Sequence, residues 1–254
     1  MGSVPSNKSQ MQPTIPVDQS IYEVSTTQKA PLGTRLEVGD RVFYYAVTSA
    51  SQARGTVLCS TDPTGSHNGA LCIVADAATT GATTVTISAG SAVTALEYDE
   101  GYMGISKGTQ GGSVYRIKKT PTISSAGTGS LTLYDALHKD LAASDEVGLI
   151  RNIYKNVIVA SMALAGIPVC VPMVDVTAGG YFWGQTYGPA APVNEAATPV
   201  GASLKVGTLG KVLAFSLGGT TSGCVAQQAS IIGKNYNLAG TAGEYTPVFL
   251  TIRQ

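Results

Sequence analysis

Two histidines, His67 and His138, are the only imidazoles that this chain of 254 residues offers for acid–base or nucleophilic chemistry. A Ser-His-Asp arrangement needs a histidine held beside a serine and oriented by an acid. His67 lies in the turn sequence SHNG, and His138 precedes Lys139 and Asp140 in a second turn-like stretch, so neither has a recognisable nucleophile setting. We therefore predict that the chain is not an enzyme.

Two Gly-Lys pairs, which end at Lys211 and Lys234, resemble fragments of a phosphate-binding loop. That loop requires Ser or Thr directly after the lysine and a second glycine upstream at a set spacing. Val212 and Asn235 follow the two lysines instead, and the upstream glycine is missing from both segments. We expect neither pair to bind phosphate, and we predict no cofactor.

The four cysteines show no Cys-x-x-Cys pair and no histidine at metal-ligand spacing, so zinc is not expected: Cys59, Cys72, Cys170 and Cys224. Cys170 lies in the apolar run VPVCVPMV and is interpreted as a small buried hydrophobic residue. Cys59 and Cys72 flank a turn-rich segment and could face each other across a hairpin, although a reduced pair in a cytoplasm is the default. No metal site is predicted.

Paired acids occur at Asp99-Glu100 and at Asp145-Glu146, each beside a predicted strand. Acids at such positions commonly prevent unwanted pairing at a sheet edge, and a cation site is the alternative. A sugar-cleaving site would need two carboxylates facing each other across the scissile bond, and no acidic cluster accompanies the aromatic residues described next.

Aromatic side chains concentrate in the segment GGYFWGQTYG, residues 179–188, which contains the only tryptophan. Strand alternation places Tyr181 and Trp183 on one face and Phe182 on the other. If Tyr181 and Trp183 are exposed, they can stack on sugar rings. If they are buried, they are core residues or anchors between subunits, which is the interpretation that we favour.

Charge and composition narrow the class of protein. The formal net charge is zero, so nucleic acid is not an expected partner, because phosphate binding needs clustered Lys and Arg. The densest basic group, Arg116, Lys118 and Lys119, lies on an alternating stretch typical of a solvated strand face. Residues 156–254 carry only seven formal charges among many Gly, Ala, Thr and Val, which suits packed β-structure that faces other protein.

Strand-length runs separated by Gly, Ser, Thr or Asp recur along the chain and predict an all-β fold. The uncharged stretch 157–174 is long enough to resemble a membrane span. Gly166, Pro168 and Pro172 disfavour a helix there, so we predict two buried strands around a turn and no membrane partner. The N-terminal sequence lacks the apolar core of a signal peptide, and synthesis in a cytoplasm is expected.

The pattern of runs predicts four segments. Residues 1–30 form an extended N-terminal arm, residues 31–68 and 152–254 form an outer domain of β-sandwich or barrel-like form, and residues 69–151 form an inserted small β-barrel. Six strand-length runs at regular spacing carry the barrel prediction. Helical signal is confined almost entirely to YDALHKDLAAS, residues 134–144.

The predicted arm is polar and interrupted by prolines, yet it carries apolar side chains, Ile15 and Tyr22 among them. Such a segment can be a floppy terminus or a clamp on a partner subunit, and the sequence favours neither.

The order of the segments LGTRLEVGDRVFYYA, EYDEGYMGISKGTQGGSVYRIKK, GLIRNIYKNVIVA, GIPVCVPMVDVTAGGYFWGQTYGPA and AGEYTPVFLTIR resembles a group of virion structural proteins of tailed bacteriophages. Members of this group are capsid decoration or cement proteins, or uncharacterised head proteins. The resemblance covers roughly residues 32–254, and it brings no catalytic residue with it.

The resemblance implies a non-enzymatic protein on the capsid surface of the virion that bridges subunits of the major capsid protein, commonly as a homotrimer and often with an extended arm. The residues expected at capsid or subunit contacts are Ile15, Tyr22, Pro31, Leu32, Tyr181 and Trp183. The alternative is a tail or fibre component that binds a host surface glycan through Tyr181, Trp183 and Tyr187. The major shell subunit itself is disfavoured because no long spine helix is predicted, and a depolymerase is disfavoured because no carboxylate cluster is found.

Overall fold

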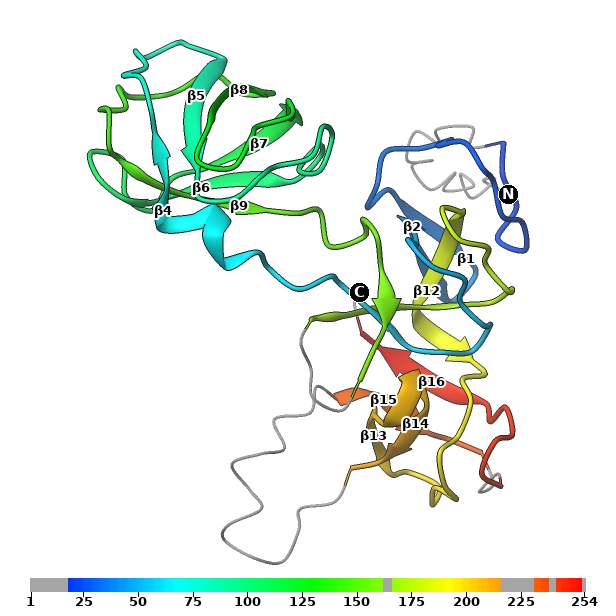
Figure 1. The fold of residues 1–254 in the computed structure, drawn as a ribbon. Coiled ribbons are helices and arrows are strands. Elements are labelled where there is room, and N and C mark those ends of the chain that lie inside the picture. The colour runs from blue at the N-terminus through cyan, green and yellow to red at the C-terminus, as the bar shows by residue number, and fades with distance from the viewer. Residues whose placement is uncertain (1–17, 162–165, 216–230, 238–240, 253–254) are drawn as a thin grey trace, which may run out of the picture.

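The structure is a computed structural model that describes residues 18–161, 166–215, 231–237 and 241–252. The described chain is built from strands, and its only helical elements are two single 3₁₀ turns, η1 (Gly65–His67) and η2 (Thr208–Gly210). It forms a closed barrel and a curled sheet, which lie apart and are joined by two chain segments (Figure 1). The predicted all-β fold with a small barrel is confirmed.

The barrel closes in the order β4-β5-β8-β7-β6-β9, and all of its strand pairs are antiparallel. Apolar side chains alternate with exposed ones along its strands, and the inward set forms a core that belongs to the barrel alone. Its six strands are β4 (Asn68–Val74), β5 (Thr84–Ala89), β6 (Tyr102–Lys107), β7 (Val114–Lys119), β8 (Thr128–Leu133) and β9 (Glu146–Ile150).

The outer domain contains a ten-stranded sheet in the order β10-β3-β11-β12-β16-β15-β13-β14, with β2 paired to β12 and β1 paired to β2. The long strand β12 pairs with three others, β2, β11 and β16, and so joins the two parts of the domain. The strands are β1 (Arg35–Val38), β2 (Arg41–Val47), β3 (Leu58–Cys59), β10 (Ile158–Val159), β11 (Pro168–Pro172), β12 (Tyr181–Ala190), β13 (Ser203–Val206), β14 (Val212–Ala214), β15 (Ile231–Asn235) and β16 (Val248–Thr251).

Aromatic side chains of β2 and β12 pack together inside the outer domain. The Tyr45 and Trp183 rings lie 4.9 Å apart between centroids, and both side chains are buried. Gln19 closes this cluster: it accepts a hydrogen bond from the Tyr45 hydroxyl at 2.7 Å, and its backbone carbonyl accepts one from Trp183 Nε1 at 3.2 Å. Residues 18–30, which the sequence places in the arm, therefore pack on the outer domain of their own chain.

The helical prediction for residues 134–144 is wrong, because this segment contains no helix and has an irregular backbone. Leu137 and Leu141 are buried in the barrel core, and their backbone N–H groups donate to the carbonyls of Ala82 and Ala78, each at 2.8 Å. Bonds to a distant segment replace the i−4 bonds of a helix.

The possible hairpin contact between Cys59 and Cys72 is corrected too. Cys59 lies in β3 of the outer domain and Cys72 in β4 of the barrel, and both are buried free thiols. The apolar stretch 157–174 contains β10 and β11, which flank β3, with residues 162–165 outside the described residues. Within the described part of the chain, no helix has the length and apolarity needed to cross a membrane.

Candidate functional site

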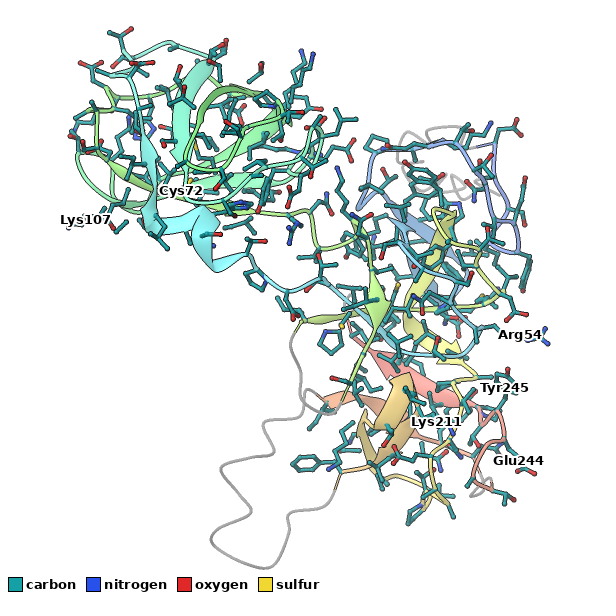
Figure 2. The ribbon with its side chains drawn as sticks, in the orientation of Figure 1. Arg54, Cys72, Lys107, Lys211, Glu244 and Tyr245 are labelled. Atoms are coloured by element: carbon teal, nitrogen blue, oxygen red, sulfur yellow. The ribbon has the colours of Figure 1, made fainter. Side chains whose placement is uncertain are left out.

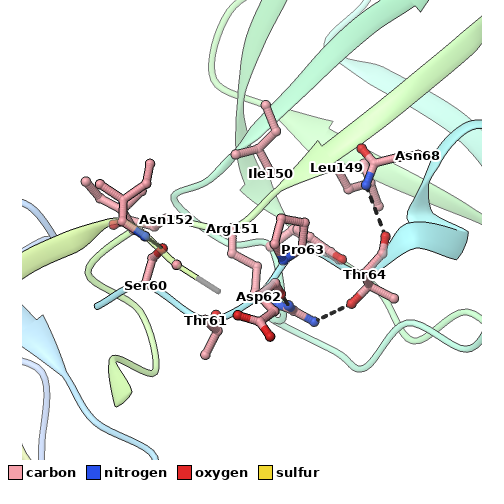
Figure 3. A pocket seen from close by; sticks show the side chains of 14 residues that line it. Ser60, Thr61, Asp62, Pro63, Thr64, Asn68, Leu149, Ile150, Arg151 and Asn152 are labelled. Carbon is pink, nitrogen blue, oxygen red and sulfur yellow. Dashed lines mark hydrogen bonds between the residues drawn. The ribbon is translucent and has the colours of Figure 1, made fainter. Parts of the chain in front are cut away.

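The two segments that join the barrel to the outer domain form a neck, and a pocket of about 440 Å³ lies along it (Figure 3). One wall is the segment that enters the barrel, residues 60–64, and the other is the segment that leaves it, residues 150–153. The exposed side chains of Ile150 and Ile167 contribute apolar surface to its lining.

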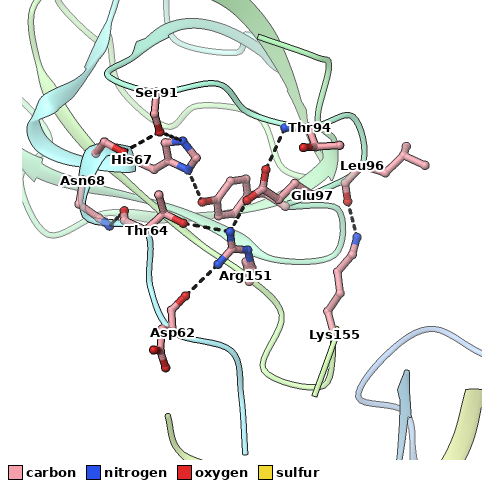
Figure 4. Close-up of polar contacts among 12 residues, drawn as sticks. Asp62, Thr64, His67, Asn68, Ser91, Thr94, Leu96, Glu97, Arg151 and Lys155 are labelled. Atoms are coloured by element: carbon pink, nitrogen blue, oxygen red, sulfur yellow. Dashed lines mark hydrogen bonds and ion pairs between the residues drawn. The ribbon is translucent and has the colours of Figure 1, made fainter. Parts of the chain in front are cut away.

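Arg151 directly follows β9 and contacts several segments of the neck (Figure 4). Its guanidinium donates to the Asp62 carbonyl at 2.8 Å and to the Thr64 hydroxyl at 3.0 Å, and it forms an ion pair with the Glu97 carboxylate. The same group lies 5.3 Å from the centroid of the Tyr98 ring, within cation–π range. One side chain thus ties the incoming segment, the outgoing segment and a barrel loop together.

A relay of hydrogen bonds continues from Arg151 into the barrel. Thr64 Oγ1 accepts from Arg151, and the Thr64 side chain also hydrogen-bonds to Tyr98. The Tyr98 hydroxyl lies 2.5 Å from His67 Nδ1, and His67 Nε2 lies 2.9 Å from Ser91 Oγ. The neutral imidazole donates at one of these two contacts and accepts at the other.

Both ring nitrogens of His67 are held, one by Tyr98 and the other by Ser91. The group behind His67 is the Tyr98 hydroxyl, where a Ser-His-Asp arrangement has a carboxylate. Burial raises the pKa of Tyr98 to about 12, so this hydroxyl remains neutral over the ordinary pH range. We interpret the contacts among Ser91, His67 and Tyr98 as structural contacts that hold η1 against the barrel.

The barrel is held to the outer domain by a second group of contacts around Glu100, a non-glycine residue with a positive φ of 63°. Its carboxylate accepts from the Leu32 backbone N–H at 2.7 Å and from Gln28 Nε2 at 3.3 Å. Asn152 Nδ2 donates to the carbonyls of Leu32 and Glu100, at 3.3 and 3.2 Å. The contact restrains the barrel relative to residues 28–32.

Lys155 adds a cation to the same side of the neck, where its ammonium group donates to the Leu96 carbonyl. Burial lowers the pKa of Lys155, while the neighbouring acids Asp99, Glu100 and Glu97 act in the opposite direction. These acids favour the charged form of a lysine that the fold has partly removed from water.

The residues expected at capsid or subunit contacts divide into four groups. Tyr22 is 58% exposed and Pro31 is also exposed, so both remain available to a partner. Leu32 and Trp183, at 6% and 1% exposed, pack inside the core of their own chain, which for Trp183 is the buried position that the sequence favoured. Tyr181 is half-buried against Tyr45, and Ile15 lies outside the described residues.

The other candidate side chains serve local structure. Asp99 accepts from the Thr120 N–H at 2.7 Å, Asp145 accepts from the Ala142 N–H at 3.0 Å, and Glu146 pairs with Lys107 at 3.1 Å. His138 Nδ1 lies 2.6 Å from the Tyr115 hydroxyl. Among the residues with described positions, no group of three His, Cys, Asp or Glu side chains is placed to hold a metal ion.

The sequence did not reveal the neck network, because its members have no local spacing. His67 and Ser91 are separated by 24 positions, and Arg151 and Glu97 by 54. Comparisons of the chain with protein-family models, with curated proteins and with solved structures found no match.

Proposed function

We propose that the chain is a non-enzymatic virion structural protein that decorates a bacteriophage capsid and bridges subunits of the major capsid protein, and that it associates as a homotrimer. The proposal is based on the resemblance of roughly residues 32–254 to head proteins of tailed phages. One structural observation supports it above all: two β-bodies, each with its own core, are joined by a neck that side-chain contacts restrain.

A protein that bridges neighbouring shell subunits needs separate contact surfaces at a set spacing. Two independently packed bodies supply separate surfaces, and the contacts of Arg151, Glu100 and Asn152 set the spacing between them. Binding at many equivalent joints makes modest affinity at each joint sufficient for stable attachment.

Exposed apolar side chains on both bodies suit such contacts. On the outer domain, Val200, Ile231 and Tyr236 lie along one shallow pocket of about 470 Å³. On the barrel, Leu71 and Val114 are each 60% exposed. Grouped apolar residues on a surface are typical of protein–protein contact sites.

The test is an electron cryomicroscopy map of intact particles, together with re-binding of the purified chain to particles that lack it. We expect density at the three-fold and quasi-three-fold positions of the head, saturable re-binding, and a trimeric mass in solution by light scattering. Density confined to the tail or fibres, or no re-binding to heads, would overturn the proposal.

The glycan-binding alternative is less well supported. Its aromatic platform required Tyr181 and Trp183 to share an exposed face, but Trp183 is buried and its Nε1 is occupied by the Gln19 carbonyl. A sugar ring cannot stack on an indole that is already packed inside the core.

A further inference from the structure

A second pocket, of about 400 Å³, opens on the outer domain away from the neck. Strands β11 and β12 contribute Pro172 and Gln185 to its lining, and the loops between strands contribute Arg54, Met173 and Tyr245. Figure 2 shows Arg54 and Tyr245 projecting on the same side of the outer domain. A volume of this size suits a small molecule.

Gly55 helps to fix the shape of the pocket. Its backbone forms two hydrogen bonds to neighbouring segments: the N–H donates to the Pro172 carbonyl at 2.8 Å, and the carbonyl accepts from the Val193 N–H at 2.9 Å. A Cβ at Gly55 would meet the Tyr245 ring at 2.7 Å, and its φ is +72°. Glycine therefore permits the ring of Tyr245 to stand close against the loop as a wall of the pocket.

Gln185, which lines the pocket, has a side-chain hydrogen-bond acceptor without a partner. Its side-chain nitrogen donates to the carbonyls of Tyr187 and Pro189, at 3.0 and 2.7 Å, so the orientation of the amide is determined. Its Oε1 is buried and has no hydrogen-bond partner among the described residues, while the whole residue is 1% exposed. A buried acceptor without a partner destabilises the fold, and a hydrogen-bond donor from a ligand would relieve that cost.

The rim of the same pocket is cationic. Arg54 is exposed, and within the described part of the chain its guanidinium forms no ion pair. The carboxylate of Asp175 accepts from the Arg54 backbone N–H at 2.9 Å. Arg41 adds a second cation beside the wall, with its guanidinium 3.8 Å from Met173 Sδ.

We propose that this pocket is a binding site for a small amphiphilic carboxylate. The apolar body of the ligand lies between the Tyr245 ring and the Pro172–Met173 wall, a hydrogen-bond donor at one end reaches Gln185 Oε1, and the carboxylate at the other end pairs with Arg54. The inference does not depend on the capsid role, because it rests on a pocket within the outer domain of a single chain.

The test uses three probes on the full chain, followed by NMR chemical shifts and by thermal shift. The first probe, 4-hydroxyphenylacetate, carries the donor, the ring and the carboxylate. Phenylacetate lacks the donor, and 4-hydroxyphenylacetamide lacks the charge. We expect saturable shifts around Tyr245 and Gln185 with the first probe, and dissociation constants about fivefold to tenfold higher with each of the other two.

Arg54→Gln is the matched variant, with Arg35→Gln on the remote strand β1 as its control. We expect Arg54→Gln to weaken binding of 4-hydroxyphenylacetate about fivefold to tenfold and to leave 4-hydroxyphenylacetamide unaffected, whereas Arg35→Gln changes neither. Non-saturating shifts, equal affinity for the three probes, or an equal effect of both variants would overturn the proposal.

Discussion

At the scale of single residues, Arg151 concentrates more interactions than any other side chain of the neck. It satisfies a backbone carbonyl, a hydroxyl and a carboxylate with donors of one planar group, and it covers an aromatic ring. Removal of either partner from a partly buried ion pair leaves the other charge without compensation. The ion pair with Glu97 can therefore be tested by comparing single and double substitutions.

Arg151→Met is expected to lower the free energy of unfolding of the barrel by about 2–3 kcal/mol, because it leaves the Glu97 carboxylate partly buried without its cation. Glu97→Gln alone is expected to cost less, and the double variant Arg151→Met/Glu97→Gln less than the sum of the two singles. Urea unfolding followed by far-UV circular dichroism measures all three. Strictly additive losses would contradict a coupled pair.

Tyr98 makes stability depend on alkaline pH. Burial raises its pKa from the ordinary 10 to about 12, so the neutral hydroxyl is favoured in the folded state. Its contribution is fully present below pH 10 and is lost as the pH rises from 10 to 12, amounting to roughly 2 kcal/mol. Tyr98→Phe removes this titration, so the stability gap between wild type and variant should narrow by about that amount over this pH window.

Denaturant unfolding of both proteins at pH 9 and at pH 11.5 measures the change. Other groups that titrate at alkaline pH away from Tyr98, such as Tyr45, whose pKa burial also raises, are the same in both proteins and cancel in the comparison. A stability gap that is the same at both pH values would show that Tyr98 does not carry the effect.

At the scale of elements, β12 determines the outer domain, because β2, β11 and β16 all pair with it. Its pairing with β11 brings Gly184 against Cys170, so that a Cβ at Gly184 would lie 2.3 Å from Cys170 Sγ and 2.6 Å from Cys170 Cβ. The side chain of Cys170 fills the space beside Gly184, and only a residue without a side chain fits there.

Gly184→Ala is expected to destabilise the outer domain by about 1–3 kcal/mol through overpacking. Adding Cys170→Gly removes the clashing atoms, so the double variant should lose less than the sum of the singles. Gly104→Ala in β6 is the control, since a Cβ there meets only the Gly148 carbonyl, at 4.0 Å, and its loss should stay within about 0.5 kcal/mol. Trp183 fluorescence reports the outer-domain variants, and circular dichroism reports the control.

At the scale of the whole molecule, two bodies with separate cores share a neck. Native stability is then distributed between units that can open separately. The chain carries natural probes for each unit: Trp183, the only tryptophan, lies in the outer domain, and the buried thiol of Cys72 lies in the barrel.

Leu131→Ala, in the barrel core, is expected to lower the denaturant midpoint for labelling of the Cys72 thiol, at a cost of about 2–5 kcal/mol, while the Trp183 fluorescence midpoint stays unchanged. Leu250→Ala in the outer domain should do the reverse. Mass spectrometry of labelled peptides separates Cys72 from the other thiols. Equal shifts of both probes in both variants would mean that the bodies unfold as one unit.

The periodicity of single segments predicted much of the fold. β5 alternates exposed or partly exposed residues with buried ones, as the sequence TVTISA predicts, and similar alternation marks the other barrel strands. Residues 134–144 were mispredicted because Leu137 and Leu141, four positions apart, fit a helical stripe equally well. Their partners at residues 78 to 82 are distant in the chain, and a local pattern carries no information about them.

The sequence by itself determined the class of structure, because the alternation of apolar and polar side chains is a local property that strands impose over a few residues. Only the tertiary structure decided that Trp183 is internal, that His67 lies between Tyr98 and Ser91, and that Arg151 joins both segments of the neck. These relations depend on closure of the barrel and on the pairing of β12, which bring together residues that no spacing along the chain connects.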